Sequence, residues 1–316
     1  LWRLRGLFYN AIGERFMERY STEKDFATRE AMSRAIFKEV REGRGSPHGG
    51  AYLSFRHLPK NLLEVCLEEL RDNPFMMALK EAGVDIREEA IEIGPAAHYV
   101  QGGCWINQLC ETSILGLFAV GEVGSGEKDG ADRLAGNSLP FCMAMGSIAG
   151  KEAAIRAKTI SAPSIDEAQV RNICSYALSP LEHQGGLRPM KVKREIRSLM
   201  STHMMFDRSK DGLEAGIKEL MKIRNEEFLS VSAKAKKFNL EWVEALEARN
   251  MLDVAEMSMR AALMRDESRG LHQRIDYPVE NPEWFKHIII SKTDQEMRLT
   301  AKPVEFSIYP PNLGIQ

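Results

Sequence analysis

The fold is decided by an apolar run that ends in a glycine and an acid, Leu115-Gly116-Leu117-Phe118-Ala119-Val120-Gly121-Glu122. A glycine-rich loop follows, and then the stretch 134–157, where small residues recur among apolar ones as in a helix packed closely on a sheet. A strand, a glycine loop and a helix in this order are how α/β folds bring backbone amides to a ligand. The sequence therefore predicts an α/β unit with a ligand site at its glycine loop.

The residues upstream of this unit mix short elements with glycine turns. Apolar residues at three- and four-residue spacing predict helices over 25–41 and 61–71. Alternation predicts a strand over 51–55, and a second short strand is expected over 91–93. We therefore expect an α+β segment over 1–93.

Downstream of the glycine loop and its helix, the chain turns helical. Amphipathic patterns with breaks between them predict four helices, over 166–177, 190–204, 212–229 and 240–265. Helices of this length in series form a small antiparallel bundle. The pattern then becomes extended, and a strand is expected over 284–290.

Composition and charge exclude several classes of protein. The 316 residues are 44% hydrophobic and 28% charged, as in soluble globular proteins. A formal net charge of −2 supplies no field that would attract nucleic acid or an anionic membrane. Neither a bilayer-length apolar run nor a signal-peptide pattern is present, so we expect an intracellular chain. The 5 cysteines are scattered and never spaced as Cys-x-x-Cys, which disfavours a disulfide framework or an iron–sulfur cluster held by this chain.

Common phosphate and metal signatures can be set aside. The stretch 43–48 has two glycines at dinucleotide-binding spacing but a histidine where the third belongs. The stretch 146–152 is one residue short of a P-loop and has a glutamate where the magnesium-binding hydroxyl belongs. The spacing of His98, Cys104 and Cys110 fits no zinc pattern, and we expect no metal.

Three polar residues could serve a ligand, and each has an ordinary alternative. His98 precedes a double glycine that lets backbone approach a ligand closely, but a lone histidine is also a common core or surface residue. Arg133 can hold a carboxylate through two parallel bonds, or it can pair with Asp129 or Asp132. Arg29 lies near the start of a predicted helix, where a cation opposes the helix dipole, and is otherwise a solvated arginine. Taken singly, none of them identifies a site.

Taken together, these residues belong to motifs that resemble one family in order and rough spacing. The motifs are Thr28-Arg29-Glu30-Ala31-Met32-Ser33-Arg34-Ala35-Ile36, Tyr52-Leu53-Ser54-Phe55-Arg56-His57-Leu58, Ala97-His98-Tyr99 with Gly102-Gly103, Gly116-Leu117-Phe118-Ala119-Val120-Gly121-Glu122, and Gly130-Ala131-Asp132-Arg133-Leu134-Ala135-Gly136-Asn137-Ser138-Leu139. They resemble the flavoprotein subunit of succinate dehydrogenase and fumarate reductase, with L-aspartate oxidase as a near relative. The match continues through 265–272 and 276–278, so it covers nearly the whole chain.

The resemblance implies FAD as cofactor, a dicarboxylate such as fumarate or succinate as substrate, and hydride transfer at flavin N5. Arg29 matches the arginine that gives a proton to the substrate carbon, while His98 and Arg133 match dicarboxylate-binding positions. The cofactor-binding positions of the family are matched by Glu122, Asn137, Ser138 and Leu139. A free arginine is a weak acid, with a pKa above about 12, but a dry cationic cluster coupled to an acidic relay lets it donate a proton and recover it.

This sequence departs from the family pattern at several positions near those residues. Glu30 replaces the usual aspartate after the catalytic arginine, Ser54 replaces another aspartate, and 94–97 lacks an arginine and a threonine hydroxyl. Asp129 and Asp132 replace a histidine and an asparagine, which adds negative charge beside the carboxylate-binding arginine. These differences bear on the identity of the substrate more than on the reaction type.

The resemblance also implies a fold class of α/β plus α. We expect the remaining part of an α+β capping domain over 1–93, the C-terminal strands and helix of a Rossmann-like FAD-binding domain over 94–160, and an antiparallel helical domain with an extended tail over 161–316. The family's dinucleotide fingerprint is absent and the chain opens at Leu1, so we expect a piece of a longer protein that binds FAD weakly or not at all alone. A retained, stoichiometric flavin absorption band in the purified chain would contradict this expectation.

Partners and alternatives follow from the same resemblance. In this family electrons pass to a separate iron–sulfur protein and, in membrane-bound members, through it to a quinone anchor. We therefore expect a cytoplasmic protein, peripheral to the inner face of the membrane only through such partners, and no nucleic-acid partner. Two alternatives stay open: an L-aspartate oxidase or related FAD-dependent enzyme acting on another acid, and a non-catalytic piece that docks an iron–sulfur subunit.

Overall fold

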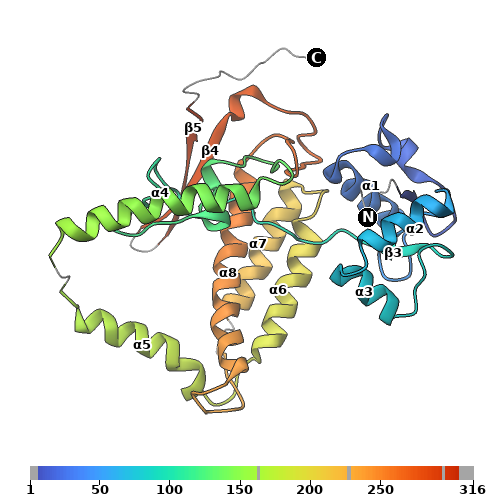
Figure 1. Cartoon of the computed structure of the whole chain (residues 1–316). Helices are drawn as coiled ribbons and strands as arrows, with labels where there is room; N and C mark the ends of the chain where they lie inside the picture. The colour runs from blue at the N-terminus through green and yellow to red at the C-terminus, as the bar shows by residue number, and fades with distance from the viewer. Residues whose placement is uncertain (1–5, 162–163, 226–228, 294–295, 306–316) are drawn as a thin grey trace. The chain divides into compact units, whose positions relative to one another are not determined.

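A computed structural model describes residues 6–161, 164–225, 229–293 and 296–305. The chain forms two compact units, Leu1–His98 and Tyr99–Gln316, which we call unit 1 and unit 2. Figure 1 shows the elements of both, with unit 1 in blue to teal and unit 2 in green to red. Each unit is described below by itself.

Unit 1 is built on a three-stranded antiparallel sheet. Its strands are β1 (Leu7–Tyr9), β2 (Ala51–Ser54) and β3 (Ile91–Ile93), in the order β1-β2-β3. The central strand pairs Leu53 with Phe8 on one side and with Ile91 on the other. The strands expected over 51–55 and 91–93 are therefore confirmed, while β1 had not been predicted.

Helix α1 (Arg29–Arg41) packs its apolar face on this sheet. The sequence pattern placed the helix start at 25, but the structure starts it later because the hydroxyl of Thr28 accepts the N–H of Ala31 and caps the first turn. Asp25 instead lies in a short 3₁₀ turn, η3 (Lys24–Phe26), and its buried carboxylate accepts the backbone N–H of Phe8. A second such turn, η2 (Phe16–Arg19), supplies two core residues. The core contains Phe8, Phe16, Met17, Ala27, Met32, Ala35, Ile36 and Ala51.

Two further helices complete unit 1. Helix α2 (Lys60–Glu69) confirms the prediction for 61–71. Helix α3 (Pro74–Glu81) had not been predicted; none of its residues is fully buried, and Met76 and Leu79 pack partly buried against the neighbouring core. A second small core of Phe55, Leu63, Ile86 and Ile91 lies beneath these helices.

Unit 2 begins with an irregular segment that packs on helix α4 (Ser138–Thr159). The strand expected over 115–120 is wrong. Gly116 has a φ of +82° and the N–H of Leu117 donates to the carbonyl of Ile114, so a turn interrupts the apolar run and leaves only an isolated bridge at Phe118. The 3₁₀ element η4 (Gly121–Glu127) then leads into the glycine-rich loop. The helix expected over 134–157 is confirmed, with its start at Ser138.

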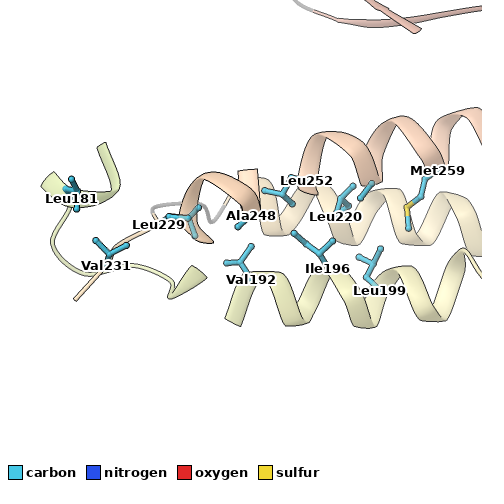
Figure 2. Close-up of a cluster of buried hydrophobic side chains, with 12 residues drawn as sticks. Leu181, Val192, Ile196, Leu199, Leu220, Leu229, Val231, Ala248, Leu252 and Met259 are labelled. Atoms are coloured by element: carbon cyan, nitrogen blue, oxygen red, sulfur yellow. The ribbon is translucent and has the colours of Figure 1, made fainter. Parts of the chain in front are cut away.

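The rest of unit 2 contains four helices: α5 (Glu167–Glu182), α6 (Pro189–His203), α7 (Lys210–Asn225) and α8 (Leu240–Met264). All four predicted helices are confirmed, but the one expected over 212–229 ends at Asn225: residues 226–228 lie outside the described residues, and Leu229 forms an isolated bridge with Leu187. Helices α6, α7 and α8 pack together with each helix antiparallel to the one before it (Figure 1), and α5 joins through the indole N–H of Trp242, which donates to the carbonyl of Ala177. Figure 2 shows their shared core, made of Leu181, Val192, Ile196, Leu199, Leu220, Leu229, Val231, Ala245, Ala248, Leu252, Ala255 and Met259.

A two-stranded antiparallel hairpin follows the bundle. The short turn η5 (Pro282–Trp284) leads into β4 (Lys286–Lys292), which pairs along its length with β5 (Met297–Pro303). The strand expected over 284–290 is confirmed with shifted bounds, and β5 had not been predicted. Within the described ranges, no helix combines the length and hydrophobicity that a membrane crossing requires.

We expect Leu252→Ala to destabilise the bundle by about 3 kcal/mol, because a fully buried leucine leaves both its transfer free energy and a cavity behind. The matched control is Leu240→Ala in the same helix, where the side chain is 77% exposed and the change should cost less than about 0.5 kcal/mol. Denaturant unfolding of the two variants checks this. Equal losses of stability would show that the bundle core does not hold the helices together.

Candidate functional site

Arg29 occupies the first position of α1 and is exposed. Among the residues that the structure describes, no carboxylate lies within ion-pairing distance of its guanidinium. The neighbouring Glu30 is largely buried and pairs with Arg34 one turn later, with 2.6 Å between Oε1 and Nε. Arg29 therefore presents an unpaired cation at a helix start, with an acid and a second arginine next to it on the same helix.

His98 is the last residue of unit 1. It follows β3 in a stretch without regular secondary structure, and its side chain is exposed. The core alternative for this histidine is thus excluded. Its imidazole, at the C-terminal end of unit 1, is exposed and can contact a ligand.

Arg133 lies in the glycine-rich loop of unit 2 and makes contacts that leave its charge uncompensated. Its guanidinium carbon is 4.3 Å from the centre of the Tyr99 ring, and Nη1 donates to the carbonyl of Leu134 over 3.3 Å. Its Nε is buried without a hydrogen-bond partner among the described residues. The alternative that Arg133 pairs with Asp129 or Asp132 is not realised among the described residues: Asp129 pairs instead with Lys128 at 3.1 Å, and Asp132 is exposed and forms no ion pair with Arg133.

The Lys128–Asp129 pair is a feature that the sequence pattern did not single out. The side chains are 16% and 3% exposed, and the Lys128 ammonium lies 3.3 Å from the centre of the Phe141 ring on α4. Aromatic faces stabilise cations electrostatically, so Phe141 and Asp129 together hold the lysine. This pair fixes the loop just before Arg133 and removes Asp129 as a competitor for its charge.

The residues matched to cofactor binding surround the start of α4. Glu122 lies in η4, where its carboxylate is exposed and accepts the N–H of Val100 over 2.8 Å. Asn137 occupies the N-cap position of α4 but makes no side-chain capping bond, and Ser138 and Leu139 are the first helical residues. Leu139 is 76% exposed. The first N–H groups of a helix have no partner within it, so this terminus can accept an anion or a carbonyl oxygen.

Glycines bring two backbone segments together beside Glu122. Gly103 has a φ of +103°, and a Cβ there would lie 2.2 Å from the carbonyl oxygen of Val123. The N–H of Cys104 donates to the same oxygen over 2.7 Å. Only glycine permits this approach, which holds the segment around Val100 against η4 and so orients Glu122.

The expected groups thus lie in separate parts of the chain: Arg29 and His98 in unit 1, and Glu122, Arg133 and 137–139 in unit 2. In unit 2 the cofactor-matched residues and Arg133 lie in η4, in the loop that leads into α4 and in the first turn of α4. Across the described ranges, no three His, Cys, Asp or Glu side chains gather in a way that could hold a metal ion.

A further contact in unit 2 was not foreseen. The turn at Gly270 and Leu271 packs on Ala131, two residues before Arg133. The sequence motif 265–270 matches the family pattern, but this match does not predict that Gly270 and Leu271 contact Ala131. The only sequence signal was a glycine inside that motif.

Comparisons with known proteins match both parts of the chain. A family model for an FAD binding domain matches residues 1–139, and a model described as fumarate reductase flavoprotein C-term matches residues 193–313. One subunit of the fumarate reductase (CoM/CoB) of Methanothermobacter marburgensis is 36% identical over 290 residues, which cover 91% of this chain and 51% of that protein. The fumarate reductase flavoprotein subunit of Escherichia coli is 30% identical, with 97% of this chain and 54% of that protein covered.

Solved structures agree with these relatives. The flavoprotein of Escherichia coli quinol fumarate reductase superposes with a TM-score of 0.86 at 29% identity, over 98% of this chain and 57% of that one. A chain of the Sdh1 complex of Mycobacterium smegmatis superposes with a TM-score of 0.82 at 31% identity, over 98% of this chain and 53% of that one. The chain thus spans about half the length of the relatives that it matches.

Proposed function

Because the chain belongs to the family of fumarate reductase and succinate dehydrogenase flavoprotein subunits, whose cofactor is FAD, we propose that it is part of an enzyme that interconverts fumarate and succinate. The proposal concerns the flavoprotein that contains this span. The relative at 36% identity carries the name fumarate reductase, which favours fumarate over another acid as the substrate.

The observation that carries this proposal is that Arg133 forms no ion pair with a carboxylate among the described residues. A guanidinium with a buried, partnerless Nε and an aromatic ring beneath it retains its attraction for an external anion. A carboxylate is the anion that its planar donors fit through two parallel hydrogen bonds. We assign Arg133 and His98 to the two carboxylates of the substrate. The positive charge of Arg133 and hydrogen bonds to these carboxylates also favour the negative charge that develops on the substrate during fumarate reduction.

Arg29 is assigned as the proton donor. In fumarate reduction one substrate carbon gains a hydride and its neighbour gains a proton, and the double bond becomes a single bond. The guanidinium of Arg29 gives that proton, and the carboxyl group of the neighbouring Glu30, which pairs with Arg34 one turn later, is the relay through which the proton is returned. Oxidation of succinate runs through the same residues in reverse.

The start of α4 fits FAD. Its uncapped N–H groups at Ser138 and Leu139 are donors for a carbonyl or phosphate oxygen, and the exposed carboxylate of Glu122 is an acceptor for ribose hydroxyls. Asn137, with a side chain that does not cap the helix, adds a further polar group. When bound, FAD supplies the hydride acceptor or donor. The residues of this chain hold it, bind the dicarboxylate and move the proton.

The domain division and the partners are part of the same proposal. We assign 1–93 to a capping domain, 94–160 to the C-terminal part of an FAD-binding domain and 161–316 to a helical domain. An iron–sulfur subunit, and through it a membrane quinone anchor, would exchange electrons with the flavoprotein and hold it at the inner face of the membrane.

Assays of the FAD-containing protein that includes this span test the proposal. We expect fumarate to be reduced by a reduced viologen dye and succinate to be oxidised by an artificial electron acceptor. L-aspartate serves as the comparison substrate. Turnover of L-aspartate without turnover of either dicarboxylate would assign the protein to the oxidase alternative, and no turnover of any of the three would favour the non-catalytic one.

A further inference from the structure

The segment 265–281 folds back on the C-terminal end of α8 and is held there by buried ionic groups. The Arg274 side chain is almost fully buried, and its Nη1 donates to the carbonyls of Ala262 and Leu263 at 2.9 and 3.2 Å. Its Nε and Nη2 bind the carboxylate of Asp276 at 2.8 and 2.7 Å. One charged residue thus satisfies the last carbonyls of the helix and fixes the returning chain.

A second buried charge fixes the turn within this segment. The Glu267 carboxylate is fully buried, and it accepts hydrogen bonds from Arg265, from Arg269 and from the N–H of Asn281. Burial alone would raise the pKa of Glu267, but these hydrogen bonds outweigh it and lower the pKa, so the carboxylate stays ionised. The N–H of Arg269 and the carbonyl of His272 then close the turn at 2.7 Å. The hydrogen bonds of Glu267 therefore fix the residues on both sides of the tip of the turn, which is formed by Gly270 and Leu271.

The tip of this turn rests on the loop that carries Arg133. The N–H of Leu271 donates to the carbonyl of Ala131 over 3.0 Å. Gly270 has a φ of +53°, and a Cβ on it would lie 2.7 Å from the same carbonyl oxygen and 2.9 Å from its carbon. Backbone meets backbone here, so no side-chain rotation can relieve a collision. Any side chain at 270 must displace either the anchored turn or the loop.

We propose that Gly270 and Leu271 are positioning residues for Arg133, through which the helical part of unit 2 sets the affinity for the dicarboxylate. This inference rests on the proposed function, in which Arg133 binds a substrate carboxylate. The turn is anchored by Glu267 and Arg274, whereas the loop has glycines at 130 and 136 with φ values of +60° and +80°. A side chain at position 270 should therefore shift the loop at Ala131 and not the anchored turn, and the shift of the loop should move Arg133.

The test is Gly270→Ala in the FAD-containing protein, with the KM for fumarate and kcat measured separately. We expect KM to rise about tenfold and kcat to fall less than about threefold, with flavin content unchanged. The control is Gly185→Ala, because Gly185 has a φ of +77° but nothing within 4 Å of an added Cβ. It carries the same backbone strain without the collision, and its KM should not change.

Coupling to Arg133 separates positioning from general stability. Arg133→Gln alone should raise KM by at least about tenfold, and Gly270→Ala added to it should cause little further rise, because both changes remove one interaction. Full additivity of the two effects would overturn the proposal. If Arg133→Gln leaves KM unchanged, or the unaltered protein turns over no dicarboxylate, the proposed function fails instead.

A milder variant keeps the proposal testable if Gly270→Ala does not fold. The side-chain amide of Gln273 donates to the carbonyl of Gly270 over 2.6 Å, so Gln273→Ala loosens the tip without a collision. We expect a rise in KM of about threefold, again lost in the Arg133→Gln background. An unchanged KM in Gln273→Ala, together with an unchanged KM or an unfolded protein for Gly270→Ala, would overturn the positioning role.

Discussion

Arg29→Gln lowers the turnover of fumarate by about a thousandfold while the flavin stays bound, because a glutamine amide cannot give up a proton to the substrate carbon. Arg29 lies exposed at the first position of α1 and makes no ion pair among the described residues. Removing a cation from a helix N-terminus does not weaken the helix. The loss should therefore appear in kcat, not in stability or in flavin content.

The control for Arg29→Gln is Arg41→Gln at the other end of the same helix. Arg41 is also exposed, and its guanidinium lies 5.9 Å from the centre of the Phe37 ring. Its replacement should leave kcat within about twofold of the unaltered protein, as surface substitutions are usually close to neutral. Steady-state kinetics and the flavin absorption of both variants provide the measurement. Retained turnover in Arg29→Gln would remove Arg29 from the proton-transfer role.

Arg44→Met destabilises unit 1 by more than the loss of an exposed ion pair would, because it removes the cation that binds both oxygens of a buried carboxylate and leaves it with the more distant Arg19, whose Nη1 lies 3.5 Å from one oxygen. The carboxylate belongs to Glu39, which is fully buried on α1. Arg44 binds both of its oxygens at 2.7 Å, and Tyr20 and Asn10 donate to it at 2.6 and 2.8 Å. Denaturant unfolding of the variant gives the loss of stability. Hydrogen exchange of the β1 and β2 amides shows whether unit 1 is the part that is destabilised.

The control for Arg44→Met is Arg71→Met, which removes an exposed ion pair with Glu68. Exposed pairs contribute less than about 1 kcal/mol, so this variant should be nearly neutral. Replacing both members, as Glu39→Leu with Arg44→Met, should recover part of the loss because no charge is left buried. A loss in the single variant no larger than that in the control would contradict the role of the pair.

The same pair predicts a pH dependence for unit 1. Burial raises the pKa of Glu39, but hydrogen bonds from Arg44, Tyr20 and Asn10 outweigh it and bring the pKa to about 2. A carboxylate with a depressed pKa in the folded state stabilises it above the unfolded value, near 4.5. This contribution is lost as the pH falls from about 4.5 towards 2. In Arg44→Met the acid-induced loss should be smaller.

The helices of the bundle could be predicted because their periodicity and their burial coincide. Leu252 and Met259 are about two helical turns apart and fully buried in α8, so the apolar stripe in the sequence is the contact face in the structure. Helix α3 has no fully buried residue and packs through the partly buried Met76 and Leu79, and β5 is largely exposed, so apolar pattern and burial coincide less closely in both. Both depend on caps and pairing that a pattern of apolar residues does not contain.

The strand predicted over 115–120 failed for the opposite reason. Its apolar pattern is present, but Gly116 turns the backbone and no neighbouring strand pairs along it within the described ranges. Apolar runs report burial, and burial alone does not distinguish a strand from a packed loop. Here the run contributes Ala119 to a small core against Met145 and Ala149 of α4.

The candidate site could be predicted only as separate residues. Arg29, His98 and Arg133 came from ordered motifs, which assign roles but not surroundings. Within the described part of the chain, Asp129 is not a partner of Arg133 because it pairs with Lys128, and Lys128 in turn lies against the ring of Phe141 on α4. The support from Gly270 comes from a turn far along the chain. Such contacts are set by tertiary packing and leave no local periodicity.

The amide of Leu271 offers a direct probe of the Arg133 loop. Its hydrogen is donated to the carbonyl of Ala131, so it can exchange with deuterium from solvent only when the turn and the loop separate. In the fast-reclosing regime, its protection factor gives the free energy of that separation. The exchange rate of this one amide hydrogen thus reports how often the loop separates from the turn. Mass spectrometry or NMR can follow it with and without a dicarboxylate.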